Sequence, residues 1–223
     1  MLLEGKTMVV TGAAGILGHA VATAAREQGA KVVLLDVVDR FDANLGVSHV
    51  VNLMDAQAVV SCFAGIGPFD ALANIAGGFA MGPTVAGTDD ADWDAMFDIN
   101  VKTLLHVVRS AVPSLIEQGR GSIVNVGALG ALRGAGHMGA YTAAKSTVMR
   151  LTEALSDELK TQGVNVNAVL PSLIDTPKNR ADMPDADFST WVSPADLAAV
   201  ICFLASDSAC AVHGALVPVN GLV

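Results

Sequence analysis

The sequence predicts a single doubly wound α/β domain over residues 1–223, with a parallel sheet of about seven strands and helices on both faces. Three observations predict it. Helix-like stretches end at Gly29, Gly119 and Gly163, where glycine readily adopts the left-handed conformation that closes a helix. The β-branched runs that follow are apolar on both faces, as strands inside a covered parallel sheet are. Strand and helix patterns alternate along the chain, which is typical of this fold class.

Each expected strand is a short apolar or β-branched run, and each expected helix is a longer stretch between two such runs. The strands are Thr7–Thr11, Lys31–Asp36, His49–Asn52, Asp70–Asn74, Ser122–Val126, Val164–Leu170 and Ala215–Val219. The helices are Gly18–Gln28, Ala56–Ala64, Ala91–Gln118, Gly139–Gln162 and Pro194–Ala205. Ser193 and Pro194 give the last helix an N-cap and a first-turn proline. Pro113 is expected to bend or end its helix early, because proline lacks the N–H that an inner turn needs.

Residues 171–192 interrupt this alternation, because they contain three prolines, four aspartates and Trp191. Structureless loops of this length are uncommon in compact domains and are usually lids or disordered segments. We therefore expect a substrate lid here, within one domain and without a linker to a second one.

Composition excludes several classes of protein. Apolar residues make up 52% of the chain and charged residues 16%, which excludes a disordered chain. A net charge of −9 argues against binding to nucleic acid, because no basic surface can replace its counterions. No apolar run reaches the roughly 18 residues of a membrane span, and no signal-peptide pattern opens the chain. Cys62, Cys202 and Cys210 form no C-x-x-C pair, so we expect a cytoplasmic protein with reduced thiols.

Residues 11–18 read Thr-Gly-Ala-Ala-Gly-Ile-Leu-Gly, between the first expected strand and helix. Glycines here let the backbone approach a pyrophosphate, whose charge suits the N-terminus of a helix. Taken alone, the motif is also compatible with an ordinary tight turn. Asp36 ends the next strand, where a carboxylate binds both ribose hydroxyls and repels a 2′-phosphate. Arg40 is the only nearby cation and is expected to be solvated, so a Rossmann-type domain that binds NAD(H) rather than NADP(H) is predicted.

Other sites find little support. No Gly-Lys-Ser/Thr follows the glycine loop, which disfavours a phosphoryl-transfer NTPase. The five histidines lack the spacing of zinc ligands, and no metal is expected. His137, just before the expected helix 139–162, is the only one that we consider for the substrate site.

Tyr141 is the only tyrosine, and Lys145 follows it by four residues, on the same face of the expected helix. An ammonium near a phenol lowers the pKa of the phenol, which can then exchange a proton with a carbonyl or imine during hydride transfer. The alternative is a plain pair on a helix surface. Against it, the glycine-rich stretch 130–139 suits a loop over a cleft, and the pair follows the fifth strand, near the edge where doubly wound folds bind ligands.

Asn100 lies on an apolar stripe formed by Trp93, Phe97, Leu104 and Val108. A polar group on such a stripe needs partners. It is either a structural hydrogen bonder or part of a water relay to Lys145.

Together these residues resemble the short-chain dehydrogenase/reductase family, with further matches at Asn74–Gly77, 167–176 and 203–207. The resemblance covers essentially the whole chain. It implies that Tyr141 is the catalytic acid/base, that Lys145 binds the nicotinamide ribose and that Asn100 relays protons. It also implies a homodimer or homotetramer. The residues expected around the cofactor are Gly12, Ala14, Gly15, Ile16, Leu17, Gly18, Asp36, Asn52, Leu53, Asn74, Ala76, Gly77, Tyr141, Lys145, Pro171, Ser172, Ile174 and Thr176.

The chain departs from the family pattern at several places. The glycine spacing is Thr-Gly-x-x-Gly-x-x-Gly, Asn52 replaces a common aspartate, and Ser172 replaces a glycine. Most important, Ala128 stands where the family has its catalytic serine, which removes a hydrogen-bond donor to the substrate oxygen. We expect Ala128, His137 and Trp191 to line the substrate site.

Several of these departures are similar to the dihydropteridine reductases. The shared features are the Gly-x-x-Gly-x-Leu-Gly loop, Asp36-Val37-Val38, Gly-Ala in place of the serine, and the lid with Trp191. The resemblance implies a quinonoid ring substrate, whose reduction needs less help than that of a ketone.

The sequence thus predicts an NAD(H)-dependent oxidoreductase that transfers hydride between nicotinamide and a small cyclic carbonyl, imine or quinonoid substrate. One alternative is a quinonoid dihydropteridine reductase. Another is a dinucleotide-binding protein whose chemistry is impaired by Ala128.

Overall fold

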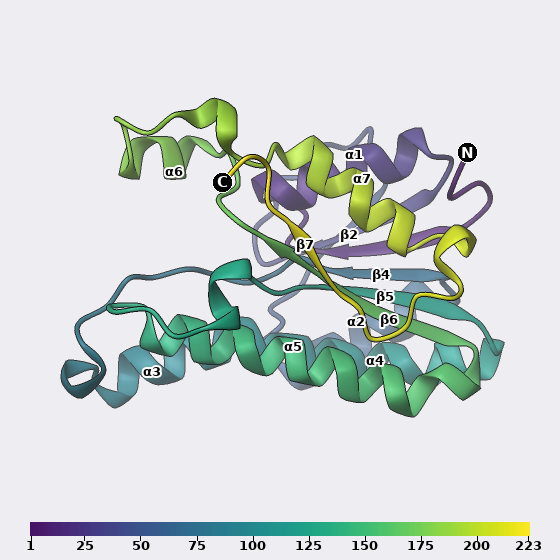
Figure 1. Cartoon of the computed structure of the whole chain (residues 1–223). Helices are drawn as coiled ribbons and strands as arrows, with labels where there is room; N and C mark the ends of the chain where they lie inside the picture. The colour runs from purple at the N-terminus through teal and green to yellow at the C-terminus, as the bar shows by residue number, and fades with distance from the viewer.

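A seven-stranded parallel sheet forms the centre of the computed structural model, which describes residues 1–223 (Figure 1). Its order is β3-β2-β1-β4-β5-β6-β7, and the fold class predicted from the sequence is confirmed. The strands are β1 (Thr7–Thr11), β2 (Lys31–Asp36), β3 (Val47–Val50), β4 (Ala71–Asn74), β5 (Gly121–Val126), β6 (Val164–Pro171) and β7 (Leu216–Val219). The direction of winding reverses between β1 and β4, and ligands bind outside the carboxyl ends of the strands at such a point.

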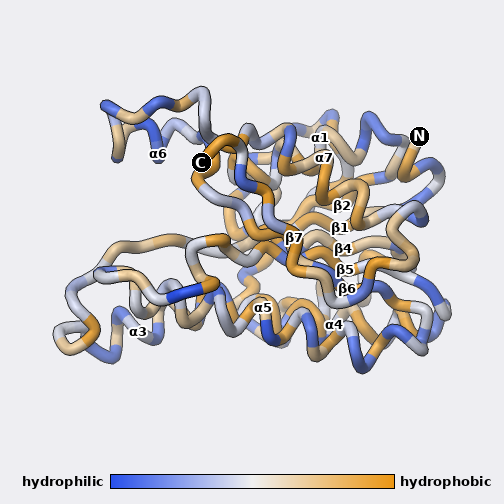
Figure 2. The backbone as a smooth tube through the Cα atoms, in the orientation of Figure 1, coloured by the Kyte–Doolittle hydropathy of each residue, from blue (hydrophilic) through white to orange (hydrophobic).

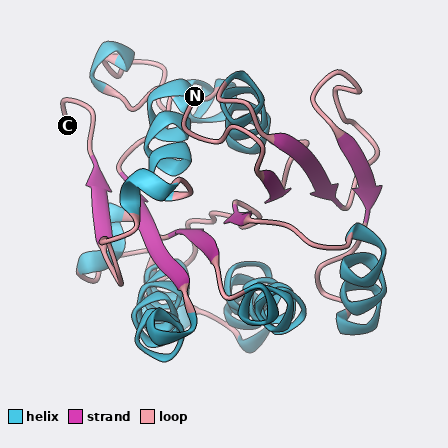
Figure 3. Cartoon of the chain, turned by 90° about the vertical axis from the view of Figure 1, so that its right-hand side faces the viewer, coloured by secondary structure: helices cyan, strands magenta, loops and turns pink.

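Helices cover both faces of the sheet, as the end-on view shows (Figure 3). They are α1 (Ile16–Glu27), α2 (Ala56–Ile66), α3 (Asp90–Phe97), α4 (Thr103–Gln118), α5 (Gly139–Leu159), α6 (Pro177–Asp182) and α7 (Pro194–Leu204). The pair α1 and α7 lies on one face, and α2, α4 and α5 lie on the other (Figure 1). None of these helices has the combination of length and apolar character needed to cross a membrane.

The side chains of β2 show why the strand is apolar throughout. Val32 and Leu34 pack in a cluster with α1 and α7, whereas Leu35 packs in a second cluster with α2 and α4. Alternate side chains thus enter different cores, and the strands of the sheet are coloured mostly as hydrophobic in Figure 2.

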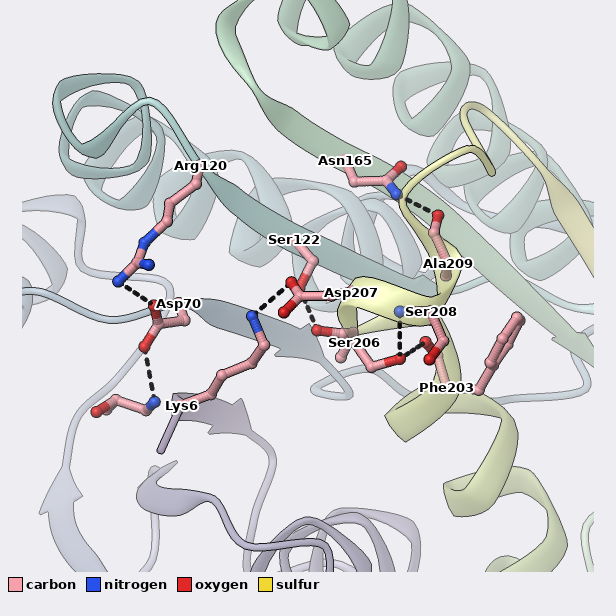
Figure 4. A network of polar contacts seen from close by, with 12 residues as sticks. Lys6, Asp70, Arg120, Ser122, Asn165, Phe203, Ser206, Asp207, Ser208 and Ala209 are labelled. Atoms are coloured by element: carbon pink, nitrogen blue, oxygen red, sulfur yellow. Dashed lines mark hydrogen bonds and ion pairs between the residues drawn. The ribbon is translucent and has the colours of Figure 1, made fainter. Parts of the chain in front are cut away.

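Charged and polar contacts tie the amino ends of the strands together (Figure 4). The Asp70 carboxylate accepts a hydrogen bond from the backbone N–H of Thr7 at 2.9 Å and pairs with Arg120 at 3.2 Å. Lys6 pairs with Asp207 at 2.7 Å. These contacts join the starts of β1, β4 and β5 at the edge opposite the glycine loop.

The element boundaries either coincide with the predicted ones or differ from them by one to three residues, except around residues 98–102. Helix α1 begins at Ile16 rather than Gly18, because Gly15 is its N-cap. Strand β3 covers Val47–Val50 rather than 49–52, because it pairs in register with β2 at the exposed edge of the sheet.

The helical stretch predicted over 91–118 is present, but it is not one regular α-helix. Residues Asp98–Lys102 form a π-helical turn that separates α3 from α4. Pro113 neither ends nor shortens α4, which continues to Gln118. Pro113 has no N–H, so the carbonyl of Arg109 loses its helical partner. Both residues lie on the exposed side of the helix, and the proline is therefore tolerated.

The segment 171–192 is not the structureless loop that its composition suggests. It contains α6 and a 3₁₀ turn at Phe188–Thr190, and a β-bridge between Ile174 and Val192 closes its base. Arg180 pairs with Asp175 through two hydrogen bonds of 2.5 and 2.7 Å. Its guanidinium also lies 4.8 Å from the centre of the Phe188 ring.

Candidate active site

In the glycine loop, residues 11–18, the backbone at Gly12 and Gly18 lies too close to neighbouring backbone atoms for a side chain to fit. A Cβ on Gly18 would lie 2.1 Å from the Gly12 carbonyl oxygen, and one on Gly12 would lie 2.9 Å from the Ala76 backbone. Gly12 also has a φ of 65°, a left-handed conformation that favours glycine. No side chain caps the N-terminus of α1, where Ile16 and Leu17 follow the N-cap Gly15. The first-turn N–H groups therefore suit a pyrophosphate.

Asp36 faces this loop from the carboxyl end of β2. Its carboxylate accepts hydrogen bonds from the backbone N–H groups of Ala14 at 3.0 Å and Val37 at 2.7 Å. These donors fix the orientation of the acid beside the loop, and the ribose site predicted for Asp36 is compatible with this geometry.

The end of β4 lies against the predicted catalytic residues. The Thr11 hydroxyl accepts hydrogen bonds from the N–H groups of residues 75–76, each at 3.1 Å. A Cβ on Gly77 would lie 2.8 Å from Asn100 Oδ1 and 3.3 Å from Lys145 Nζ. The structure thus brings the segment Asn74–Gly77, Asn100 and Lys145 together, as the sequence predicts.

Two amides and a buried leucine border the same edge. Asn52 Oδ1 accepts a hydrogen bond from Met54 N–H at 3.0 Å, and the carbonyl of buried Leu53 bonds to His106 Nδ1 at 2.8 Å. Asn74 Nδ2 donates to Asn125 at 2.9 Å, but its Oδ1 is buried without a partner. Such an acceptor costs about 1–3 kcal/mol, so the end of β4 is not built for stability alone.

The polar side chains between β6 and α6 are used within the protein. The Ser172 hydroxyl donates to the Asn220 carbonyl at 2.7 Å, which accommodates a serine where the family has glycine after Pro171. Thr176 caps α6, and the Ile174 carbonyl accepts a hydrogen bond from Asn179. The backbone from Pro171 to Thr176 is therefore held in place beside the carboxyl end of β6.

Tyr141 and Lys145 lie on the first two turns of α5, which covers the sheet at this edge. The Tyr141 ring packs edge-to-face on Phe79 with 4.8 Å between ring centres. Lys145 is 7% exposed, and its ammonium donates a hydrogen bond to the Val126 carbonyl at 2.9 Å. The ammonium is thereby held at the end of β5.

Burial alone shifts both pKa values. It raises the pKa of the Tyr141 phenol to about 12 and lowers the pKa of the Lys145 ammonium to about 8. The expected lowering of the tyrosine pKa by the lysine is therefore wrong for this structure, because desolvation of the phenolate dominates. At neutral pH Tyr141 holds its proton, as a proton donor in a reduction must.

Because Tyr141 is the only tyrosine, its titration can be followed directly by the ultraviolet absorbance of tyrosinate. In the native protein free of NAD(H), we expect almost no tyrosinate at pH 10, because burial raises the pKa of Tyr141 to about 12. The same protein unfolded in urea serves as the control and should titrate near the free value of about 10. Coincident native and unfolded titration curves would contradict the structure.

Asn100 lies in the π-helical turn, and both ends of its amide are hydrogen-bonded. Nδ2 donates to the carbonyls of Met96 at 3.0 Å and Gly78 at 3.1 Å, and Oδ1 accepts from Gly78 N–H at 3.1 Å. The geometry favours the structural alternative for this side chain, which holds the backbone after β4. A proton relay through Asn100 stays a prediction.

A cavity of about 220 Å³ opens beside Tyr141. It is lined by Ala80, Met81, Gly82, Pro83, Thr88, Asp92, Ala95, Met96, His137, Met138, Gly139, Ala140 and Tyr141. Of the three residues expected at the substrate, only His137 lines it. Ala128 is buried in a cluster with Met149 and Leu170, and Trp191 is buried with its ring packed on Phe188.

Apart from Tyr141 and His137, the residues that line the cavity were not predicted as site residues. Met81, Asp92 and Met96 belong to a loop and helix that follow the carboxyl end of β4. Their position after that strand was the only available signal, because binding residues gather on loops at this edge of the sheet.

His137 has the only positive φ among the non-glycine residues, 62°. Its carbonyl accepts a hydrogen bond from the backbone N–H of Gly82 at 2.9 Å. A left-handed conformation costs a non-glycine residue about 1–2 kcal/mol, although histidine tolerates it better than most. Such a cost is typical of functional sites.

Comparison with known proteins agrees with this geometry. Residues 6–187 match the family model described as short chain dehydrogenase. The chain is 30% identical to the 3-oxoacyl-(acyl-carrier-protein) reductase FabG of Thermotoga maritima, over 99% of this chain and 98% of that protein.

Solved structures give the same result. Carveol dehydrogenase from Mycobacterium avium, in complex with NAD, superposes with a TM-score of 0.89 at 26% identity, covering 99% of this chain and 98% of that one. A protein of Beutenbergia cavernae assigned as an NAD(P) dependent gluconate 5-dehydrogenase, with bound NADP, gives a TM-score of 0.90 at 29% identity, covering 98% and 96%. The protein belongs to the short chain dehydrogenase family, whose members are oxidoreductases.

Proposed function

We propose that the protein is an NAD(H)-dependent oxidoreductase that transfers hydride between nicotinamide and a small cyclic carbonyl, imine or quinonoid compound. The observation that carries the proposal is the position of Tyr141. Its protonated phenol borders a cavity of about 220 Å³, one helical turn from a buried lysine. A proton donor at the edge where the fold binds dinucleotides is what carbonyl reduction requires.

Asp36 supports NAD(H) as the cofactor. Among the solved relatives above, one binds NAD and the other binds NADP, so the family alone does not decide. In this chain the Asp36 carboxylate is held beside the glycine loop by Ala14 and Val37. It would accept hydrogen bonds from both ribose hydroxyls and would repel a 2′-phosphate. Arg40 is exposed and pairs with no acid, in agreement with its predicted solvated state.

The residues of the chain then divide the work of the reaction. The N-terminus of α1 would bind the pyrophosphate, and Lys145 would donate hydrogen bonds to the nicotinamide ribose while it keeps its hydrogen bond to the Val126 carbonyl. The nicotinamide supplies the hydride. Tyr141 gives its proton to the substrate oxygen or nitrogen that receives the electron pair, and is reprotonated before the next turnover. Phe79 packs edge-to-face on the phenol ring.

The cavity indicates the kind of substrate. Three methionines line it, Met81, Met96 and Met138, and these flexible side chains adapt to apolar rings. Asp92 is its only acidic residue, and no lysine or arginine lines it. A compact ring without an anionic group therefore fits better than a phosphate, sulfonate or carboxylate compound.

Two narrower alternatives remain as hypotheses. If the protein is a dihydropteridine reductase, it should reduce a quinonoid pterin in particular. The hypothesis of a dinucleotide-binding protein with impaired catalysis rests on Ala128, which is buried and offers no hydrogen-bond donor to a substrate. Assembly into a homodimer or homotetramer and a cytoplasmic location also stay predictions.

The test is NADH consumption in the presence of quinonoid dihydropterin, o-quinones, cyclic imines and cyclic ketones. We expect turnover with at least one conjugated ring, and a preference for NADH over NADPH of about 100-fold, since like charges facing each other cost several kcal/mol. The variant Asp36→Ala should narrow that preference and serves as the matched control. Tight NADH binding with no turnover of any compound would favour a dinucleotide-binding protein with impaired catalysis. Equal use of NADH and NADPH would contradict the proposal that Asp36 selects NADH.

A further inference from the structure

A hydrogen-bond donor is missing from the site as the family builds it. Ala128 contributes only a methyl group, which packs in the same cluster as Tyr141. The hydroxyls nearest in the chain are already engaged: Ser146 donates to the Ala131 carbonyl at 2.7 Å and Thr142 donates to the Met138 carbonyl at 2.8 Å. None of these three positions supplies a free donor to a substrate.

The cavity itself contains few side chains that can donate. Of its lining residues, only Thr88, His137 and Tyr141 carry an N–H or O–H group in the side chain. The Thr88 hydroxyl donates to the Thr84 carbonyl at 3.1 Å. The imidazole of His137 forms no hydrogen bond or ion pair within the chain. His137 is therefore the one free donor beside Tyr141.

Backbone contacts hold residue His137 at the cavity, and its side chain is exposed. The left-handed conformation of His137 turns the chain just before α5, and the hydrogen bond from Gly82 N–H fixes its carbonyl. The neighbouring Gly139 lies close to Val85, since a Cβ there would lie 2.8 Å from Val85 Cγ2. The turn 135–139 is thus in contact with the loop after β4, which forms the other wall of the cavity.

We propose that His137 is a second catalytic residue, whose imidazole N–H donates a hydrogen bond to the substrate in place of the missing serine. The proposal rests on the proposed function. Hydride adds to the electrophilic carbon of the substrate as NADH becomes NAD⁺, and the C=O or C=N electron pair moves to the heteroatom, which takes the Tyr141 proton. With an o-quinone, the added hydrogen then leaves that carbon as a proton while the second oxygen gains one, which gives the catechol. His137 keeps its proton throughout and stabilises the negative charge that develops. A conjugated ring with two acceptor atoms can use both donors at once.

Two variants separate the imidazole from the backbone conformation. His137→Gly removes the donor but adopts a positive φ freely, and His137→Asn tolerates that φ while it retains an amide N–H. With an o-quinone or quinonoid dihydropterin that the wild type reduces, we expect His137→Gly to lower kcat about 100-fold, by analogy with loss of one oxyanion donor. His137→Asn should retain kcat within about tenfold. His213→Gly, at an exposed loop histidine outside the cavity, is the matched control and should leave kcat unchanged.

A binding measurement completes the test. Calorimetry of a catechol, the product of o-quinone reduction, with the NAD⁺-loaded protein should show about tenfold weaker binding for His137→Gly, because one hydrogen bond is lost. NADH affinity and the thermal midpoint should not change.

Several outcomes would overturn the proposal. If His137→Gly retains wild-type kcat and catechol affinity while Tyr141→Phe is inactive, His137 is not the donor, and the proposed function stands. If His137→Gly and His137→Asn lower kcat equally, the effect comes from loss of the imidazole ring and not from loss of a donated hydrogen bond. A wild-type protein that binds NADH but reduces none of the compounds contradicts both this proposal and the proposed function.

Discussion

Replacing Tyr141 by phenylalanine is expected to lower turnover by about 10²–10⁴-fold, the range of general acid catalysis. The change removes one oxygen and preserves the ring that packs on Phe79. With no phenol at the cavity, the substrate heteroatom has no proton donor. NADH affinity should be unchanged, because Lys145 keeps its hydrogen bond to Val126 and the glycine loop is untouched. Steady-state NADH consumption and fluorescence titration with NADH measure the two quantities.

The control for this prediction is Phe79→Leu, which alters the same aromatic contact but leaves the phenol in place. It should reduce turnover far less than Tyr141→Phe does. The interpretation of Tyr141 as the proton donor is wrong if Tyr141→Phe keeps turnover within tenfold of the wild type, or if it loses NADH binding in parallel.

Gly18→Ala is expected to have the largest effect on the cofactor site and on stability. The new Cβ would lie 2.1 Å from the Gly12 carbonyl oxygen, and 2.8 Å from Ala13 Cα. Both atoms are backbone, so no flexible side chain can move away. We expect the free energy of unfolding to fall by about 3 kcal/mol or more. NADH should bind at least about 100-fold more weakly, because the displaced loop misplaces the N-terminus of α1.

Gly15→Ala is the matched control for the stability of the protein without cofactor. Gly15 has a φ of −80°, which alanine adopts without strain, and its Cβ would lie 3.3 Å from the same oxygen. Urea denaturation should show a loss of no more than about 1 kcal/mol for this variant. Equal stability of the two alanine variants would mean that the loop is not packed as the structure describes.

The sequence predicted those parts of the molecule that depend on short-range signals. The strands of the sheet core follow from runs such as Val32–Leu35, whose side chains are apolar on both faces. The glycine loop and Asp36 follow from residue type and spacing, because glycine and a carboxylate serve distinct physical needs there. The pairing of Tyr141 with Lys145 follows from helical periodicity.

The rest depends on contacts between distant segments, which spacing does not encode. In the π-helical turn, the amide of Asn100 bonds to Gly78, 22 residues earlier. The substrate cavity forms where the loop after β4 meets the turn before α5, so Asp92 and the methionines carried no local signal. The raised pKa of Tyr141 depends on burial, whereas the sequence showed only the charge of Lys145 nearby.

The separation between the two edges of the sheet has a consequence for how such a protein can change. The ties through Asp70 and Lys6 secure the amino ends of the strands, and every residue of the cavity lies on segments beyond the carboxyl ends. Mutations that reshape the cavity therefore leave the ties intact. Evolution or protein engineering can therefore replace the segments 79–96 and 130–139 and change the substrate, while the sheet and its contacts at the amino ends still fold.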